Sequence, residues 1–305
     1  HIPWCVKKCP YCDFNSHEVK ADMPEHDYTD ILCQDFDRDY EHCGDRPLQS
    51  IFIGGGTPSL FSAKSYDKLL SHIQTRATLS SDCEITLEAN PGTAEAEKFS
   101  DYFAAGINRL SIGIQSFDER QLKNLGRIHS SDESKRAIGF ARNAGFNNFN
   151  LDLMHGLPGQ NVDDALRDLQ TAIDFDPLHI SWYQLTIEPN TVFYTRPPTL
   201  PDEPVLTSLE DSGLALLESS GYTRYEVSAF SKENRYSRHN LNYWEFGDYL
   251  GIGAGAHGKI TLAQTNSIVR TQKHRQPNHY LHKSIQSVLK RTEIPIDERP
   301  IEFLL

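Results

Sequence analysis

Short, β-rich apolar runs alternate with helical stretches through the first two thirds of this chain. The expected strands are residues 49–54, 84–90, 109–115, 149–153 and 179–185, and the expected helices are 63–77, 94–105, 131–144 and 162–175. Such alternation requires crossover connections between parallel strands. The pattern therefore predicts an α/β fold, a partial (β/α)6 barrel, with residues 1–3 as the tail of a sixth strand.

Local signals mark the ends of several elements. Ser131 opens an acidic first turn, Thr93 precedes another, and Gly106 and Gly145 stand where C-caps are expected. Polar and turn-forming residues follow each predicted strand, at 54–58, 88–91, 115–117, Asp152, 155–158 and 184–188. Because the carboxyl ends of parallel strands meet at one edge, we expect a binding site there.

Three cysteines lie within eight residues near the start of the chain. Cys5, Cys9 and Cys12 have the spacing C-x3-C-x2-C. Thiolates hold iron–sulfur clusters, and four of them saturate a [4Fe–4S] cube. Three thiolates leave one iron open to a small molecule, so the spacing favours a [4Fe–4S] site with one free coordination position.

Other interpretations of this loop stay open. Cys9 and Cys12 alone form a C-x-x-C pair that suits a dithiol, but this gives Cys5 no role. A zinc site needs a fourth ligand, for which His17 is the nearest candidate. A structural disulfide needs an oxidising compartment, and no secretory segment is visible. The remaining cysteines, Cys33, Cys43 and Cys83, lack metal spacing and are expected to be free thiols.

Composition limits the function classes. The chain has 305 residues and a net charge of −12. An acidic chain argues against nucleic-acid binding, which depends on Lys and Arg. No apolar run reaches the length of a membrane span, so we expect a cytoplasmic protein. The chain opens on His rather than Met, and we expect further residues at both ends in the natural protein.

A Pro-rich stretch at 196–204 reads as a linker. It predicts a core domain over residues 1–195 and a smaller α+β extension over 196–305, with a helix at 205–219. Within the extension, residues 253–258 match G-x-G-x-x-G, but the next residues, 259–262, read as a strand. A dinucleotide site would need a helix there. The glycines at 54–56 are predicted to let the backbone approach a ligand closely.

Taken together, these motifs resemble the radical S-adenosylmethionine (SAM) superfamily. The match is to the group that contains oxygen-independent coproporphyrinogen III oxidase, and it covers nearly the whole chain. The segments that carry it are 53–58 (IGGGTP), 87–92 (LEANPG), 113–117 (GIQSF), 125–129 (LGRIH) and 152–158 (DLMHGLP). The resemblance implies the partial-barrel fold, a [4Fe–4S] cluster and SAM.

Two sequence features distinguish the branches of this group. The oxidase pattern has a further cysteine two residues after the last cluster ligand, where this chain has Phe14. Residues 239–244 (HNLNYW) resemble the H-N-x-x-Y-W motif of HemW-type heme chaperones. The resemblance therefore favours a heme chaperone over a radical enzyme that acts on a porphyrinogen. A third alternative is a catalytically idle structural relative.

The resemblance also implies residue roles. Cys5, Cys9 and Cys12 would ligate the cluster. SAM would be bound by residues at or near the strand ends and beside the cluster, namely Tyr11, Gly55, Gly56, Thr57, Glu88, Gln115, Arg127, Asp152 and Thr186. Among these, Arg127 matches a carboxylate and Asp152 can accept from ribose hydroxyls. His239 would be the heme ligand. The implied partners are heme and a heme-acceptor protein, with a homodimer and weak membrane association through the acceptor left open.

Overall fold

A computed structural model of the chain describes residues 1–19, 22–262, 264–282 and 288–299. The chain divides into two compact units, each assembled from separate stretches. Unit 1 comprises His1–Cys5, Asn15–Ile85 and Arg238–Leu305, and unit 2 comprises Val6–Phe14 and Thr86–Ser237. The boundaries of these two units differ from the predicted division at residue 195. That division stays a prediction about domains.

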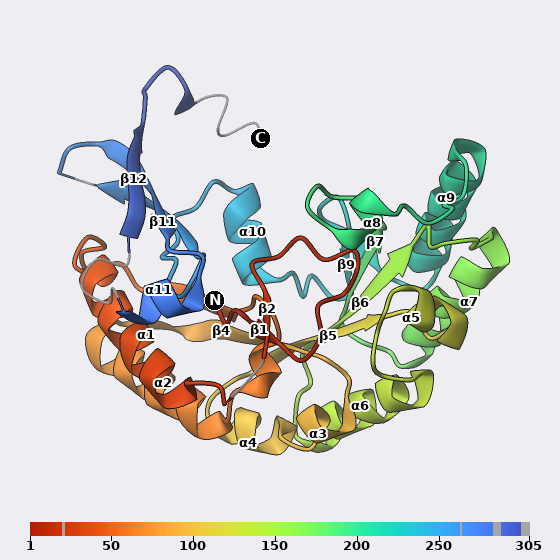
Figure 1. Cartoon of the computed structure of the whole chain (residues 1–305), viewed down its shortest axis with the longest axis horizontal. Coiled ribbons are helices and arrows are strands. Elements are labelled where there is room, and N and C mark those ends of the chain that lie inside the picture. The colour runs from red at the N-terminus through yellow and green to blue at the C-terminus, as the bar shows by residue number, and fades with distance from the viewer. Residues whose placement is uncertain (20–21, 263, 283–287, 300–305) are drawn as a thin grey trace. The chain divides into compact units, whose positions relative to one another are not determined.

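The main sheet has seven strands in the order β3-β4-β5-β6-β7-β9-β8 (Figure 1). Strands β4 to β7 are parallel, β9 runs antiparallel to β7, and β8 runs antiparallel to β9. The bounds are β3 (Leu48–Ile53), β4 (Leu79–Ala89), β5 (Arg109–Gln115), β6 (Phe149–His155), β7 (His179–Gln184), β8 (Thr223–Arg224) and β9 (Ala229–Ser231). All five predicted strands are present, which confirms the α/β class.

The predicted helices are present, with one correction. They are α2 (Ala63–Arg76), α6 (Ser131–Asn143), α7 (Val162–Asp174) and α9 (Glu203–Ser219). The single helix expected at 94–105 is instead two short helices, α3 (Thr93–Ala96) and α4 (Phe99–Ala104). The C-cap glycines are confirmed, since Gly106 and Gly145 both have φ of +98°.

Capping explains the start of α6. Ser130 accepts from the Glu133 amide, and the Glu133 carboxylate accepts in return from the Ser130 amide. This reciprocal box satisfies two amides that would otherwise be unpaired. The cap is therefore one residue earlier than the predicted start signal at Ser131.

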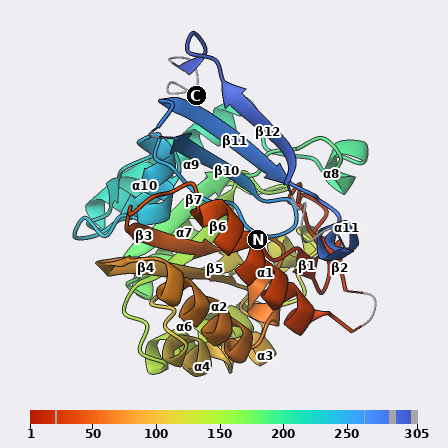
Figure 2. The same ribbon diagram turned by 90° about the vertical axis from the view of Figure 1, so that its left-hand side faces the viewer.

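Unit 1 contains a second, antiparallel sheet in the order β10-β11-β12 (Figure 2). Its strands are β10 (His257–Leu262), β11 (Ser267–Lys273) and β12 (Val288–Ile294), and the unit also holds α1 (Glu25–Tyr40), α10 (Arg238–Trp244), α11 (Pro277–His282) and the short pair β1 (Trp4–Cys5) and β2 (His17–Glu18). Strand β10 covers residues 259–262, which confirms the strand predicted there, at the position where a dinucleotide site would need a helix.

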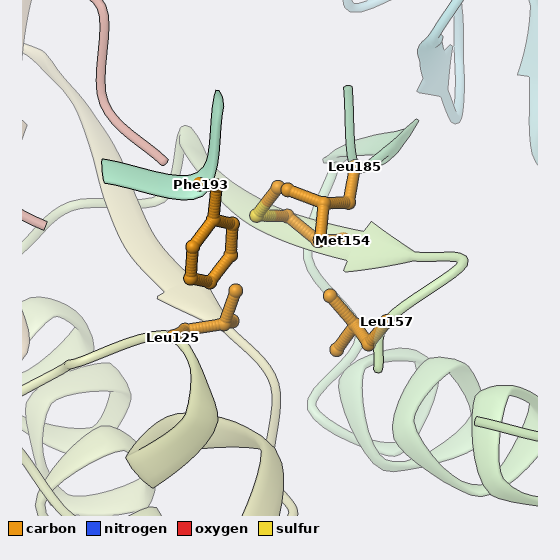
Figure 3. Packing of buried hydrophobic residues seen from close by; sticks show 5 residues of the cluster. All are labelled: Leu125, Met154, Leu157, Leu185 and Phe193. Atoms are coloured by element: carbon orange, nitrogen blue, oxygen red, sulfur yellow. The ribbon is translucent and has the colours of Figure 1, made fainter. Parts of the chain in front are cut away.

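Unit 2 has a cluster of buried apolar side chains at the ends of its strands (Figure 3). Its members are Leu125, Met154, Leu157, Leu185 and Phe193, and Tyr11 packs against them. Phe193 lies in α8 (Val192–Thr195), and its amide donates to the Pro10 carbonyl at 3.0 Å. The cluster therefore anchors the middle of the cysteine loop on unit 2.

Among the described residues, none of the helices combines the length and the apolar character that a membrane span requires.

Candidate functional site

The glycine run after β3 holds the strand that carries Cys5. The Ile2 amide donates to the Gly54 carbonyl at 2.9 Å, and the Gly56 amide donates back to the Ile2 carbonyl at 2.7 Å. The Thr57 amide donates to the Trp4 carbonyl at 2.7 Å. These groups were predicted to face a ligand. In the structure, the amides of Gly56 and Thr57 bind the chain's own segment next to Cys5, and contact of this run with SAM stays a prediction.

Gly56 is required at its position by the closeness of this approach. A Cβ atom there would lie 2.5 Å from the Trp4 carbonyl oxygen and 3.0 Å from the Cys5 Sγ. Carbon and oxygen atoms do not approach so closely without displacing the backbone. The run therefore fixes Cys5, which is itself buried, against the end of β3.

The other end of the cysteine loop is held by Asn15, which the sequence analysis did not single out. Its side-chain amide donates to the carbonyls of Ala254 and Arg275, both at 2.9 Å. The His1 imidazole Nε2 lies 3.0 Å from the Asn15 carbonyl, and the His1 main-chain nitrogen donates to Ile252 at 2.7 Å. We call His1, Asn15 and residues 252–255 the clasp.

The clasp explains the second glycine run. Gly255 has φ of +83°, and a Cβ atom there would lie 2.3 Å from the Asn15 Nδ2. Tyr28 extends the clasp, since its hydroxyl donates to the His1 carbonyl at 2.8 Å and accepts from the Ala254 amide at 2.7 Å. The only sign of this contact in the sequence was the glycine run at 253–258, which is not followed by the helix that a nucleotide site would need. Its partner is about 240 residues away.

Replacing Gly255 with alanine is expected to loosen the cysteine loop. The left-handed backbone costs an L-residue roughly 1–2 kcal/mol, and the clash with Asn15 adds to this cost. If this cost destabilises the clasp by ~1.4 kcal/mol, release of bound iron to a chelator should be about tenfold faster, because that free energy corresponds to a factor of ten. Iron release can be followed by chelator absorbance under anaerobic conditions.

Gly221→Ala is the matched control. Gly221 has φ of +84°, and no heavy atom lies within 4 Å of the added Cβ among the described residues. It carries the same backbone strain without the clash. Equal rates of iron release in the two variants would contradict a role for the clasp.

In unit 2, Arg127 joins the cysteine loop to two strand ends. Its Nη1 lies 3.7 Å from the Cys9 Sγ, and its Nη2 donates to Asn90 Oδ1 at 2.7 Å and to the Gly113 carbonyl at 2.8 Å. Burial opposes the charge, but the Tyr11 phenol and the Cys9 thiol raise the pKa of Arg127 above its ordinary value. Its Nε is buried with no hydrogen-bond partner among the described residues. Arg127 thus has one donor still to satisfy.

Asp152 and Gln115 lie at neighbouring strands of the same unit. Ser111 donates to Asp152 Oδ2 at 3.0 Å and Asn150 donates to Oδ1 at 2.7 Å. Burial raises the pKa of Asp152, and the hydrogen bonds from Ser111 and Asn150 offset part of this increase. The Tyr183 hydroxyl donates to Gln115 Oε1 at 2.7 Å. Gln115 has φ of +68°, an uncommon conformation that is often found at functional sites.

Tyr183, whose hydroxyl bonds Gln115, lies among these side chains. The pKa of Tyr183 is raised well above its ordinary value, first by burial and then by the charges of Asp152 and Tyr11. Unit 2 therefore brings together five of its predicted residues, Cys9, Tyr11, Gln115, Arg127 and Asp152. Glu88 is half-buried near the end of β4, and Thr186 is exposed just beyond β7.

The donor set fits an iron–sulfur cluster and SAM. Cys5, Cys9 and Cys12 form no disulfide bonds. Arg127 has an orphan Nε with which to meet a carboxylate, and buried Asp152 can accept from hydroxyls. Within the described ranges, no set of three or more His, Cys, Asp or Glu side chains is already gathered as a preformed metal site.

His239 lies in unit 1, in the first turn of α10. Its ring stacks on Phe52 of β3, with 4.1 Å between centroids and 14° between planes. Tyr243 lies one turn further along, on the same side of the helix, and Trp244 follows it. Both are about half exposed, at 50%. An imidazole beside exposed aromatic rings is suited to a flat, apolar metal complex.

Comparison with known proteins agrees with this chemistry. The sequence model of the Radical SAM superfamily matches residues 1–172. The heme chaperone HemW of Escherichia coli K12 is 51% identical over 306 residues, which covers 100% of this chain and 80% of that protein. The chain belongs to the HemW family of radical SAM proteins. The heme chaperone HemW of Haemophilus influenzae is 53% identical, again over 100% of this chain and 80% of that protein.

A solved structure confirms the fold. That of coproporphyrinogen III oxidase HemN from Escherichia coli, a radical SAM enzyme, aligns with a TM-score of 0.84 over 100% of this chain and 73% of that one. Its sequence is only 21% identical. The family and the fold were thus both predicted correctly from the motifs.

Proposed function

We propose that this protein is a heme chaperone that binds heme and passes it to an acceptor protein. The observation that carries the proposal is the setting of His239, whose imidazole is stacked on Phe52 and lies on a helix with two exposed aromatic rings. The full-length similarity to heme chaperones of the HemW family supports it.

Cys5, Cys9 and Cys12 are proposed to ligate a [4Fe–4S] cluster. When bound, such a cluster supplies an open iron at which the amino and carboxylate groups of SAM coordinate. Arg127 would orient the carboxylate through its unsatisfied Nε, and Asp152 would accept from the ribose hydroxyls. Tyr11, Gly55, Gly56, Thr57, Glu88, Gln115 and Thr186 stay predicted contacts of SAM.

The competing function is oxidation of a porphyrinogen by the same scaffold. Phe14 argues against it, because the oxidase pattern has a cysteine at this position. In the structure Phe14 is exposed and lies outside the core. The similarity to heme chaperones likewise does not favour the oxidase.

Heme titration of the His239→Ala variant tests the proposal. Purified protein with its cluster should bind hemin with a shifted Soret band. The variant should bind at least tenfold more weakly, because it lacks the imidazole that coordinates the iron. Titrating each protein with and without the cluster would show whether the cluster supports heme binding.

His26→Ala serves as the control, since His26 is a highly exposed histidine of α1. An unchanged Soret band and affinity in His239→Ala would overturn the assignment of the ligand. Anaerobic decarboxylation of coproporphyrinogen by the purified protein would overturn the chaperone function in favour of the oxidase.

Delivery of the bound heme to an acceptor protein is part of this proposal. A homodimer, weak membrane association through the acceptor and a cytoplasmic location also stay predictions. Mixing the heme-loaded protein with candidate apo-acceptors, and following the Soret band of the acceptor, would test delivery directly.

A further inference from the structure

A buried carboxylate lies behind the candidate heme ligand. Glu84 of β4 is only 6% exposed, and its Oε1 lies 3.3 Å from the His239 Nδ1. Both residues belong to unit 1, although 155 positions separate them. Helix α10, which carries His239, packs on β3, and β3 neighbours β4 in the sheet (Figure 2).

The Glu84 carboxylate is held in place by the main chain of α10. The Arg238 amide donates to Oε1 at 3.0 Å, and the His239 amide approaches the same oxygen at 3.5 Å. These amides belong to the first turn of the helix, where an anion is favoured. The carboxylate therefore cannot swing away from the imidazole without uncapping α10.

The orientation of the imidazole is fixed from a second side. Phe52 stacks on the His239 ring and restrains its plane, while Glu84 meets the ring at Nδ1. Because Nδ1 faces a carboxylate, the tautomer with the proton on Nδ1 is favoured. The lone pair for a metal then resides on Nε2.

We propose that Glu84 is a positioning residue for heme binding, which makes His239 a stronger electron donor to the heme iron. A histidine that donates its other N–H to a carboxylate is a more basic ligand. Ferric iron gains more from such a ligand than ferrous iron, because it carries one more positive charge. Glu84 therefore selects for oxidised heme. This inference rests on the proposed function.

The Glu84→Gln variant separates this role from helix capping. Glutamine keeps a side-chain oxygen that can cap α10, but it lacks the negative charge. The affinity for hemin should fall 10- to 100-fold, the usual effect of losing a partner behind a metal ligand. Affinity for dithionite-reduced heme should change much less. A tenfold loss confined to the ferric form raises the heme reduction potential by ~59 mV for one electron.

Asp82→Asn is the matched control. Asp82 lies two residues earlier on the same strand, is exposed, and pairs with Arg238 of the same helix. It removes the same charge without touching the imidazole, so both heme affinities should stay unchanged. Circular dichroism on all variants checks that α10 and the fold are retained.

The outcomes are distinguishable. A lower affinity for ferric heme and a higher potential in Glu84→Gln, but not in Asp82→Asn, would support the proposal. An unchanged potential in Glu84→Gln would overturn it while leaving His239 as the ligand. If His239→Ala binds heme normally, the heme site itself is misassigned, and the proposed function fails at its own test.

Discussion

Cys9→Ser is expected to remove the iron–sulfur cluster. The hydroxyl of serine does not ionise near neutral pH, so it is a poor replacement for a thiolate ligand. Iron should fall from about four atoms per chain to near zero, with loss of the visible absorbance of the cluster. Iron and sulfide assays on anaerobically reconstituted protein measure this directly.

The fold should survive this change. Cys9 is half-buried, and the loop around it is anchored by Tyr11 and Phe193 rather than by the thiol. SAM binding, measured by equilibrium dialysis, should be lost together with the cluster. Arg127 would keep its hydrogen bonds to Asn90 and Gly113, so the empty site should stay ordered.

Cys43→Ser is the control, because Cys43 is another half-buried free thiol without metal spacing. It should retain full iron content. A Cys9→Ser protein that keeps its iron would contradict the ligand assignment. If iron is lost but heme handling is untouched, the cluster has no part in the heme function, as the idle-relative alternative predicts.

Lys273→Met is expected to destabilise unit 1 more than any surface change. Lys273 of β11 is completely buried, and its Nζ lies 2.6 Å from both Asp35 Oδ1 and Asp39 Oδ2. Removing one member of a buried ionic group leaves charge uncompensated, which typically costs 3–5 kcal/mol. Arg38 also pairs with both aspartates, so we expect about 3 kcal/mol. Urea unfolding followed by circular dichroism gives the value.

Removing the Lys273 charge should also weaken the clasp. Asp35 Oδ2 accepts from the Tyr280 hydroxyl at 2.6 Å and from the Gly253 amide at 3.2 Å. An aspartate that moves or becomes protonated releases Gly253, which lies against His1. Chelators should therefore extract iron faster from Lys273→Met than from the unmodified protein.

Lys68→Met provides the comparison, because Lys68 pairs with Asp30 on the surface. Exposed pairs contribute less than about 1 kcal/mol, so this variant should unfold near the midpoint of the unmodified protein. Similar unfolding midpoints for the two variants would show that the buried network is not needed for stability.

Much of the fold could be predicted because it is encoded locally. Strand β5 has the predicted bounds, Arg109–Gln115, since the apolar residues Leu110, Ile112 and Ile114 recur at every second position, the period of a strand. Helix α1 was missed. It begins after Pro24, and no side-chain hydrogen bond caps its start, so the usual start signal is absent from the sequence.

By itself, the sequence determined the α/β class, the cysteine spacing and the family. Each depends on residues close together in the chain, where spacing translates directly into geometry. Only the tertiary structure decided which distant groups meet. It assigned the glycine runs to holding the two ends of the cysteine loop, and it put Glu84 behind His239 and Asn15 against Ala254. These pairs are separated by 155 and 239 residues, and only the packing of whole elements brings them within hydrogen-bonding distance.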